Sequence, residues 1–501
     1  MTEQSQLESA ELNERRRWIA LIVLCAGFLM IILDQTIVNV ALPTIQRDLR
    51  FSQSNLAWVV NAYLIAFGGL LLLVGRLGDL IGRRRIFLVG LTVFTSASLL
   101  CGVAHSQGLL IGARFVQGIG GAMTAAVILG MIVTMFPKPA ERARAIGVYS
   151  FVAAAGGAIG LLLGGVLTQE LNWHWIFFVN VPIGIATGLV ATRLLPSERG
   201  IGLRHGADAP GAVLLVAALM LTVYTIVEAS RYSWGSAHTL GFGAVSLALL
   251  AGFIARQATA RNPLMPLRVF RSRIVTVANL TQALMVAGIF GMFFLGALFL
   301  QRVLGYDAIE VGLAFLPVAL GIAGFSLKFT PELMMRFGAK RTLLLGLVLV
   351  AGGLIVFRGA PVNASYVRDL LPAMVLLGVG AGLVFPSVMT LAMSAATPED
   401  SGLASGLVNT SQQVGGALGL AVLATLASTH TNSLHVRGAS TASALTGGYH
   451  LAFTIGAALV IVAVVVAAVL LPTPPRLQVV EPPADADLAA EEDLAYAEEA
   501  A

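Results

Sequence analysis

The stretch "GRLGDLIGRRRIFLVG", residues 75–90, places a glycine-rich and strongly basic turn between two long apolar runs. The runs cover about 55–75 and 84–103, and each has the roughly 20 apolar residues that a helix needs to cross a membrane. A short arginine-rich loop between two such runs is the pattern that sets the topology of membrane proteins. The stretch therefore predicts two successive membrane-spanning helices joined by a charged turn.

The composition of the whole chain agrees with a membrane protein. Of its 501 residues, 57% are hydrophobic and 11% are charged, and the mean hydropathy is +0.86. A soluble domain has about 25% charged residues, so the expected class is an all-α polytopic membrane protein. The net charge of +5 lies in short loops, and we expect no nucleic-acid partner. Because the sequence has no P-loop motif, catalytic constellation or metal-ligand spacing, we expect neither an enzyme nor a cofactor or metal.

Fourteen apolar runs are long enough to span a bilayer. We expect helices, because the strands of a membrane barrel alternate in polarity and are about half as long. The predicted spans are 18–42, 55–75, 84–103, 108–136, 143–168, 174–195, 210–229, 239–257, 274–301, 309–329, 341–358, 369–394, 402–428 and 447–471.

The positions of Lys and Arg predict the orientation of the chain. With the N-terminus inside, 22 of the 31 basic residues fall in inner segments and 7 in outer segments. This bias places both termini on the cytoplasmic side of the cytoplasmic membrane. The expected organisation is a tail at 1–17, a six-helix half at 18–195, a linker with an inserted helix pair at 196–257, a second six-helix half at 258–471, and a disordered acidic tail at 472–501.

A second stretch, "PELMMRFGAKRTLLLG" at 331–346, has the same make-up as 75–90: an acid, a glycine and a basic cluster between two spans. If spans 1–6 and 9–14 are two equivalent halves, these two turns occupy equivalent places. Parallel repeats of this kind are typical of transporters with a binding site near the middle of the membrane.

The turn at 75–90 also carries the first functional motif. Its glycines permit a tight turn, and Asp79 can cap the next helix and pair with arginines. A simple topogenic loop with a helix cap is the alternative. The stretch resembles the signature loop of the major facilitator superfamily. The resemblance implies a conformational latch that joins the two halves on the cytoplasmic side, formed by Gly75, Gly78, Asp79, Gly82, Arg83 and Arg84.

The fourth span contains "GARFVQGIGGA", residues 112–122. An arginine inside a span is costly, so Arg114 needs a partner, and Gln117 lies one turn further on. The alternative is that Arg114 extends to the outer surface. The stretch resembles a second superfamily motif, R-x-x-Q-G, which implies an arginine that assists proton transfer.

The fifth span contains "GGAIGLLLGGVL", residues 156–167. Glycines at every fourth position favour close helix packing. The stretch resembles the antiporter motif G-P-x-x-G-G, but Leu161 stands at the proline place, which suggests a straighter helix. The glycines assigned to this motif are Gly156, Gly160, Gly164 and Gly165.

Asp34 is an acid within the first span, about 24 Å along the helix from Trp18 and thus in the outer half of the membrane. Arg114 lies near the same depth. Three interpretations stay open: a structural partner of Arg114, the proton or cationic-drug site, or an acid that extends to the outer surface. The first two are compatible with each other.

The surrounding stretch, "LDQTIVNVALP", resembles the first-span signature of the fourteen-span drug/proton antiporter branch, as do 262–273, 301–317 and 401–419. The resemblance implies export of amphipathic, cationic drugs or antibiotics by proton antiport. Export of one endogenous metabolite, and a facilitator or sensor without proton coupling, are the alternatives. The oligomeric state stays open, and a monomer is compatible with the sequence.

Polar and aromatic residues within spans are the candidates for the substrate cavity. The aromatic candidates and one neighbour are Asn61, Tyr63, Phe290, Phe293 and Phe294, and ordinary contacts between helices are the alternative. The polar candidates are Asn39, Gln117, Gln282, Asn409, Gln412 and Gln413.

Overall fold

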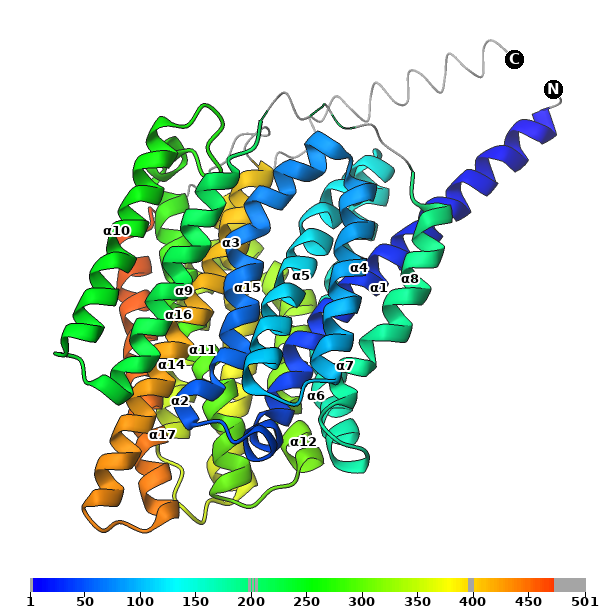
Figure 1. Ribbon diagram of the computed structural model, residues 1–501. Coiled ribbons are helices and arrows are strands. Elements are labelled where there is room, and N and C mark those ends of the chain that lie inside the picture. The colour runs from blue at the N-terminus through cyan, green and yellow to red at the C-terminus, as the bar shows by residue number, and fades with distance from the viewer. Residues whose placement is uncertain (1–2, 197–199, 201, 203–205, 395–400, 473–501) are drawn as a thin grey trace.

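Long helices run side by side through the computed structural model, which describes residues 3–196, 200, 202, 206–394 and 401–472 (Figure 1). Within these ranges the chain forms helices and turns and no β-strand. The first half consists of α1 (Glu3–Leu49), α2 (Gln53–Leu56), α3 (Trp58–Ile81), α4 (Arg83–Gly102), α5 (Gln107–Met135), α6 (Pro139–Glu170), α7 (Trp175–Phe178) and α8 (Asn180–Leu194).

Two further helices, α9 (Ala209–Tyr232) and α10 (Ala237–Thr259), form the inserted pair. The second half begins with the short helix η2 (Leu267–Arg271). Its other elements are α11 (Arg273–Arg302), α12 (Ala308–Gly324), η3 (Phe325–Phe329), α13 (Thr330–Phe337), α14 (Ala339–Arg358), η4 (Tyr366–Leu370), α15 (Leu371–Ser394), α16 (Ser401–Val436) and α17 (Thr441–Leu470).

Each predicted span coincides with a helix or with a short run of joined helices. Among the described residues, thirteen helices are long and apolar enough to cross a membrane. The remaining predicted span, 143–168, lies within α6, whose side chains are described only in part. The helical polytopic fold is thus confirmed, whereas the total of fourteen spans stays a prediction.

The N-terminal segment is described almost from its first residue, whereas the C-terminal segment is described only up to Pro472. Helix α1 begins at Glu3 and projects beyond the bundle in Figure 1, so most of the segment expected as a tail at 1–17 is helical. The acidic tail expected at 472–501 lies outside the described residues, apart from Pro472.

The two matching turns have the same backbone shape. Gly82 has φ 112° and ψ 126°, and Gly338 has φ 83° and ψ 154°. Each residue ends one helix and is followed at once by the next, α4 or α14. A positive φ is accessible to glycine at little cost, which explains a glycine at the same place in both stretches. This agreement supports two halves with equivalent turns.

We call the end of the bundle that carries these turns the basic end; it also holds the segment 260–272 and lies at the top of Figure 1. The other end, with α2, α7 and the turn between α16 and α17, is called the opposite end. The inserted pair packs beside the halves, with α9 against α3 and α16 and with α10 against α9.

A buried carboxylate ties the inserted pair together at the basic end. Asp208 caps α9 by accepting a hydrogen bond from the Gly211 amide at 3.0 Å, and it accepts bonds from Arg256 Nε at 2.5 Å and Gln257 Nε2 at 2.8 Å. Gln257 Oε1 accepts a bond from the Met265 amide at 3.0 Å. Asp208 thus joins the start of α9 to the end of α10, and Gln257 extends the link to the segment that leads into the second half.

We expect Asp208→Asn to lower the thermal stability, on the order of 1–3 kcal/mol, because a charged acceptor of three hydrogen bonds is lost. Burial acts to raise the pKa of Asp208, but the bonds from Arg256, Gln257 and Gly211 outweigh it and hold that pKa below its usual value. A lowered pKa in the folded state gives stability that is present at neutral pH and is lost as the pH falls through that pKa.

Unfolding midpoints in lipid nanodiscs across an acid series measure this effect. The wild type should lose its advantage over Asp208→Asn as the buffer becomes strongly acidic. The exposed Glu332 offers a control, since Glu332→Gln removes a carboxylate that has no ion pair in the described part of the chain. Equal midpoints for wild type and Asp208→Asn at neutral pH would contradict the stabilising role.

Candidate functional site

Asp34 on α1 and Arg114 on α5 form a buried ion pair. Arg114 Nη1 donates a hydrogen bond to Asp34 Oδ2 at 2.5 Å, and the two residues are 0% and 1% exposed. The guanidinium also donates through Nε to the Val59 carbonyl at 2.9 Å. The predicted alternatives in which either charge extends to the outer surface are therefore wrong. The expectation that the two side chains pair at a common depth agrees with the geometry.

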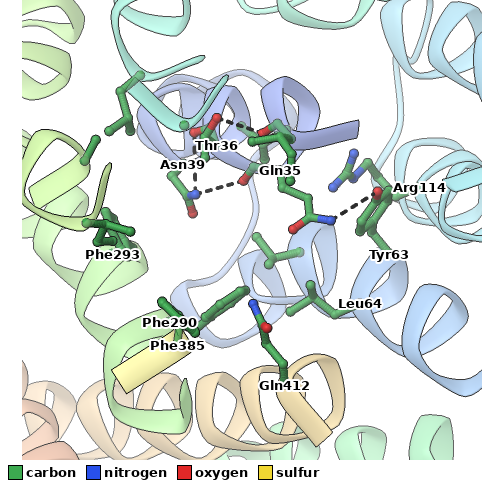
Figure 2. Close-up of a pocket in the computed structure, with 17 residues that line it drawn as sticks. Gln35, Thr36, Asn39, Tyr63, Leu64, Arg114, Phe290, Phe293, Phe385 and Gln412 are labelled. Atoms are coloured by element: carbon green, nitrogen blue, oxygen red, sulfur yellow. Dashed lines mark hydrogen bonds between the residues drawn. The ribbon is translucent and has the colours of Figure 1, made fainter. Parts of the chain in front are cut away.

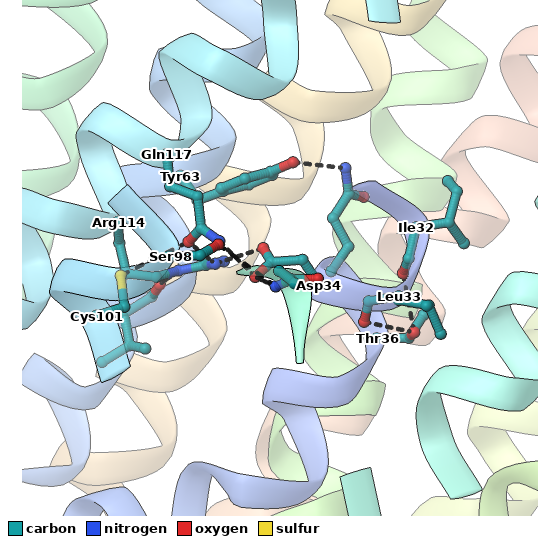
Figure 3. Close-up of polar contacts among 12 residues, drawn as sticks. Ile32, Leu33, Asp34, Thr36, Tyr63, Ser98, Cys101, Arg114 and Gln117 are labelled. Carbon is teal, nitrogen blue, oxygen red and sulfur yellow. Dashed lines mark hydrogen bonds and ion pairs between the residues drawn. The ribbon is translucent and has the colours of Figure 1, made fainter. Parts of the chain in front are cut away.

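Three polar side chains complete the network around Asp34 (Figure 3). Gln117 Oε1 accepts from Arg114 Nη1 at 2.7 Å, while Gln117 Nε2 donates to Asp34 Oδ1 at 2.7 Å and to Ser98 Oγ at 2.6 Å. Asn180 Nδ2 lies 3.3 Å from Asp34 Oδ1 and 3.4 Å from Ser98 Oγ. The network thus draws on α1, α4, α5 and α8, and both carboxylate oxygens have partners, as a buried charge requires.

Tyr63 on α3 covers the arginine side of the pair. The guanidinium carbon of Arg114 lies 4.4 Å from the centre of the Tyr63 ring, a cation–π contact. The Tyr63 hydroxyl accepts a hydrogen bond from Gln35 Nε2 at 3.5 Å. Tyr63, Gln35 and Arg114 all line a cavity, whereas Asp34 is not among its lining residues. The ion pair therefore presents its positive member to the cavity.

We call this space the central cavity; it has a volume of about 230 Å³ and lies between the two halves (Figure 2). Three aromatic rings from the second half face it, those of Phe290, Phe293 and Phe385. An apolar wall with a few convergent polar groups is the usual make-up of a small-molecule site. Its described polar lining residues are Gln35, Thr36, Asn39, Tyr63, Arg114 and Gln412.

A larger space of about 960 Å³, the vestibule, extends from the same region to the basic end. The two spaces share lining residues, among them Gln35, Phe385 and Gln412. The vestibule reaches Asp79, whose side chain is 43% exposed. A solute could therefore enter the central region from the basic end.

Contacts between the halves close the opposite end. Gln301 of α11 donates to the Val40 carbonyl of α1 at 3.1 Å, and Arg302 donates to Gln46. Gln169 of α6 donates to Asp307 at 3.2 Å. The halves also meet beside the vestibule, where Thr410 of α16 donates to the Gly68 carbonyl of α3 at 3.3 Å. The vestibule still reaches the exposed Asp79, so it connects the central region to the basic end.

The residues of the predicted latch keep their contacts within the first half. Asp79 Oδ1 accepts from Arg83 Nε and Nη2 at 3.2 and 3.0 Å. Arg83 Nη1 donates to the Gly130 carbonyl at 3.1 Å, and Arg84 donates to the Thr192 carbonyl. The recorded contacts of Asp79 do not reach the second half. A latch between the halves is therefore not engaged in this state, and its existence stays a prediction.

The glycines of the latch motif have different surroundings. A Cβ added at Gly78 would lie 2.6 Å from Val127 Cγ1, so Gly78 permits close approach of α3 and α5. Gly75 has open space around it and lines the vestibule, and Gly82 forms the turn.

The glycines of α6 form a packing face, as the four-residue spacing predicts. Added Cβ atoms at Gly156 and Gly164 would lie 2.9 Å from Leu29 Cδ1 and from the Ile37 carbonyl oxygen, and Gly160 meets Thr36, all on α1. Gly165 instead faces α12 of the other half, where an added Cβ would lie 2.7 Å from the Ala308 carbonyl oxygen. Helix α6 continues without a break through Leu161, in keeping with the missing proline.

The predicted cavity residues divide into two groups. Asn39 and Gln412 line the central cavity, and Asn409, Gln412 and Gln413 line the vestibule. Gln282 donates to Gln412 Oε1 at 3.3 Å from behind and lines neither space. Gln117 requires a correction: it is fully buried and bonded to Asp34, because its face of α5 turns toward α4 and away from the cavity.

The aromatic candidates also divide. Tyr63, Phe290 and Phe293 line the central cavity, whereas Phe294 is buried in the core and Asn61 is buried outside both spaces. Within the described residues, no group of three or more His, Cys, Asp or Glu side chains is placed to hold a metal ion.

Sequence reasoning missed Asn180, Ser98, Gln35 and Phe385. Asn180 is the polar residue in "FVNVP" and the first residue of the otherwise apolar α8. This contrast is the signal that could have identified it. Ser98 and Gln35 lie among other small or polar residues and carry no such signal. Phe385 could not be told from other phenylalanines in the spans.

A helical membrane bundle of two halves, closed at one end around a central cavity and with a buried ion pair beside it, is the architecture of a transporter. Comparison with known proteins gives the family. The chain belongs to the Major Facilitator Superfamily, whose family model matches residues 24–420. It is accordingly a membrane transporter and not an enzyme.

Several relatives are similar over most of the chain. The puromycin resistance protein of Streptomyces alboniger is 40% identical over 88% of this chain and 89% of its own length. The cephamycin export protein of Amycolatopsis lactamdurans is 39% identical over 82% and 85%. The multidrug resistance protein Stp of Mycobacterium tuberculosis is 34% identical over 82% and 75%.

Two solved structures share the fold at low sequence identity. A bacterial homologue of the human lysosomal transporter Spinster, described as inward-facing and unoccupied, has a TM-score of 0.64 at 17% identity and covers 90% of this chain and 96% of its own. The nucleoside transporter NupG has a TM-score of 0.64 at 12% identity and covers 90% and 100%.

Proposed function

We propose that this protein exports amphipathic drugs or antibiotics across the cytoplasmic membrane by proton antiport with alternating access. The observation that carries the proposal is the buried pair of Asp34 and Arg114 beside a cavity that the vestibule connects to the basic end. The relatives named for antibiotic resistance or export support the substrate class.

The orientation follows from the excess of basic residues. The basic end carries the arginine-rich turns, so we assign it, with both termini, to the cytoplasm. The described state then faces inward, and the vestibule receives substrate from the cytoplasm.

Asp34 couples the substrate cycle to the proton in this mechanism. Protonation removes the charge that attracts Arg114, and the guanidinium then needs a new partner. Asp34 lies on α1 and Arg114 lies on α5, so the loss of their ion pair changes the packing of α1 against α5. Helix α1 also packs on α6 and α11, so this change reaches both halves. Reopening at the opposite end would require the bridges at Gln301 and Gln169 to break.

The latch acts in the complementary state. When the vestibule closes, the turn between α3 and α4 approaches the second half, and Asp79 exchanges part of its contact with Arg83 for contacts across the interface. This exchange would favour the outward-facing state.

A dedicated exporter of one compound is the second candidate function. The observation in its favour is that two of the relatives are named for a single antibiotic, puromycin or cephamycin.

We expect expression in an efflux-deficient bacterial host to raise the inhibitory concentrations of several structurally unrelated amphipathic antibiotics severalfold. The panel should include puromycin, a cephamycin, aromatic dyes and cationic antiseptics, with an empty vector as the control. Protection against one compound alone would favour the dedicated exporter. Protection against none, with the protein present in the membrane, would contradict export of antibiotics.

A further inference from the structure

The formal charge among the described residues that line the central cavity is of one sign. Among its described lining residues, Arg114 is the one with a permanent charge, and there is no Asp or Glu. The counter-charge, Asp34, is fully buried, is paired with Arg114 and is not among the residues that line the cavity. A cation in the cavity would therefore meet the positive member of the pair with no carboxylate beside it.

Arg114 also has an unused donor. Its Nε and Nη1 atoms are bonded to Val59, Asp34 and Gln117, but Nη2 has no hydrogen-bond partner among the described residues. The residue is 1% exposed and lines the central cavity, where Figure 2 shows it beside Tyr63. A buried guanidinium with a free N–H group favours an oxygen acceptor, and most strongly an anionic one.

Uncharged groups supply the other polar contacts. Gln412 accepts from Gln282 through Oε1, which leaves its amide nitrogen without a recorded partner at the junction of the two spaces. Asn39 Nδ2 donates to the Gln35 carbonyl at 3.0 Å, and the Asn39 side-chain oxygen can accept a hydrogen bond from a substrate. These amides can bond a neutral polar group, but they add no negative charge.

The aromatic residues do not reverse this preference. The face of Tyr63 already holds the Arg114 guanidinium at 4.4 Å. The three phenylalanine rings can contact a cation, but they serve a neutral ring system equally through apolar packing.

The vestibule has the same sign of charge as the cavity. Its described lining residues include four arginines and two aspartates, and Asp79 is paired with Arg83 while Asp208 is paired with Arg256. Since arginines outnumber aspartates among the described lining residues, these residues favour anions over cations that approach from the basic end. The lining arginines are Arg76, Arg83, Arg261 and Arg268.

We propose that the central cavity selects uncharged or anionic aromatic amphiphiles that offer an oxygen acceptor to Arg114, and that it discriminates against permanent cations. This inference deepens the proposed export function and rests on it, and it departs from the expectation of cationic substrates. A cationic substrate would find no carboxylate among the described lining residues, because Asp34 is buried and does not line the cavity.

The test uses two probes of nearly equal shape and opposite charge, tetraphenylphosphonium and tetraphenylborate. Saturable binding of each to the purified protein in lipid nanodiscs is measured by equilibrium dialysis, and the uptake by empty nanodiscs is subtracted. We expect the borate to bind about tenfold or more tightly than the phosphonium. Tighter binding of the phosphonium, or no saturable binding of either ion, would overturn the inference.

Two variants test whether the lining sets the preference. Gln412→Glu adds a carboxylate where the two spaces meet and should shift the affinity ratio toward the phosphonium, whereas Gln412→Met, of similar length and no charge, should retain the preference for the borate. Asn39→Asp repeats the test from the first half if Gln412→Glu does not fold. An unchanged ratio in a folded acidic variant would overturn the inference.

The outcome is separable from that of the export proposal. Resistance to antibiotics together with tighter binding of the phosphonium would refute the charge preference and leave export intact. A preference for the borate with no resistance to any compound would support the charge preference and refute export.

Discussion

Replacing Asp34 with asparagine should abolish the release of protons that substrate drives in everted vesicles, down to the level of vesicles without the transporter. Asparagine keeps the size of the side chain and an oxygen that can accept from Gln117, but it has no charge to exchange with a proton. Resistance in growth assays should be lost together with the proton signal. Undiminished proton release would contradict the coupling role of Asp34.

The single variant also leaves Arg114 without its counter-charge. Removal of one partner of a buried ion pair costs on the order of 3–5 kcal/mol, although Arg114 keeps its bonds to Val59 and Gln117. Stability therefore has to be followed by size-exclusion chromatography and by the unfolding midpoint. Glu332→Gln is the matched control, since Glu332 is exposed, and its proton release should equal that of the wild type.

A double variant, Asp34→Asn with Arg114→Gln, separates the two interpretations of the pair. If Asp34 only holds Arg114 in place, removal of both charges should restore stability, together with transport of substrates that do not need the contact with Arg114. If Asp34 carries the proton, the double variant should regain stability and still release no protons. We expect the second result, because a neutral pair satisfies the buried hydrogen bonds but offers no group that titrates.

The helices and their turns were predictable because their signals are local. A membrane span can be recognised from about 20 successive apolar residues, independently of the rest of the chain. The turns at Gly82 and Gly338 have positive φ, so each requires a glycine at the same offset in two otherwise different stretches. The tail at the N-terminus was interpreted from its polarity alone, and polarity does not stop α1 from beginning at Glu3.

The candidate site was predictable only as far as depth along a helix determines contact. Asp34 and Arg114 were matched because each must avoid lipid and both lie at the same level. The sequence does not predict how α5 is rotated about its own axis. Gln117 was therefore expected in the cavity, whereas its side chain contacts Ser98. Depth also left open whether Asp34 lines the substrate cavity, and the packing shows that Arg114 lines it while Asp34 does not.

Asn180 shows where single-sequence reasoning ends. It reaches the network from α8, a helix 146 residues away in the chain from Asp34. No spacing rule connects residues on separate helices, because the contact depends on which helices are neighbours in the folded bundle. The family resemblance assigned no role to this position.

Replacing Gly165 with leucine should hold the opposite end open and stop transport. A Cβ added at Gly165 would lie 2.7 Å from the Ala308 carbonyl oxygen and 2.8 Å from Ile309 Cα, and backbone atoms cannot move aside as a flexible side chain does. The two halves would then have to separate at the seam between α6 and α12. Gly147→Leu is the matched control in the same helix, since nothing lies within 4 Å of an added Cβ there.

A cysteine placed at Asn39 reports on this separation, since Asn39 lines the central cavity. The native Cys25 and Cys101 are buried and are first replaced by alanine. A membrane-impermeant maleimide should label the Asn39→Cys protein mainly in everted vesicles, where the basic end is outside. With Gly165→Leu it should label right-side-out vesicles as well, and with Gly147→Leu it should not. The prediction is wrong if the Gly165→Leu protein transports normally and its Asn39→Cys is not labelled in right-side-out vesicles. In that case the contact at Gly165 does not close the opposite end.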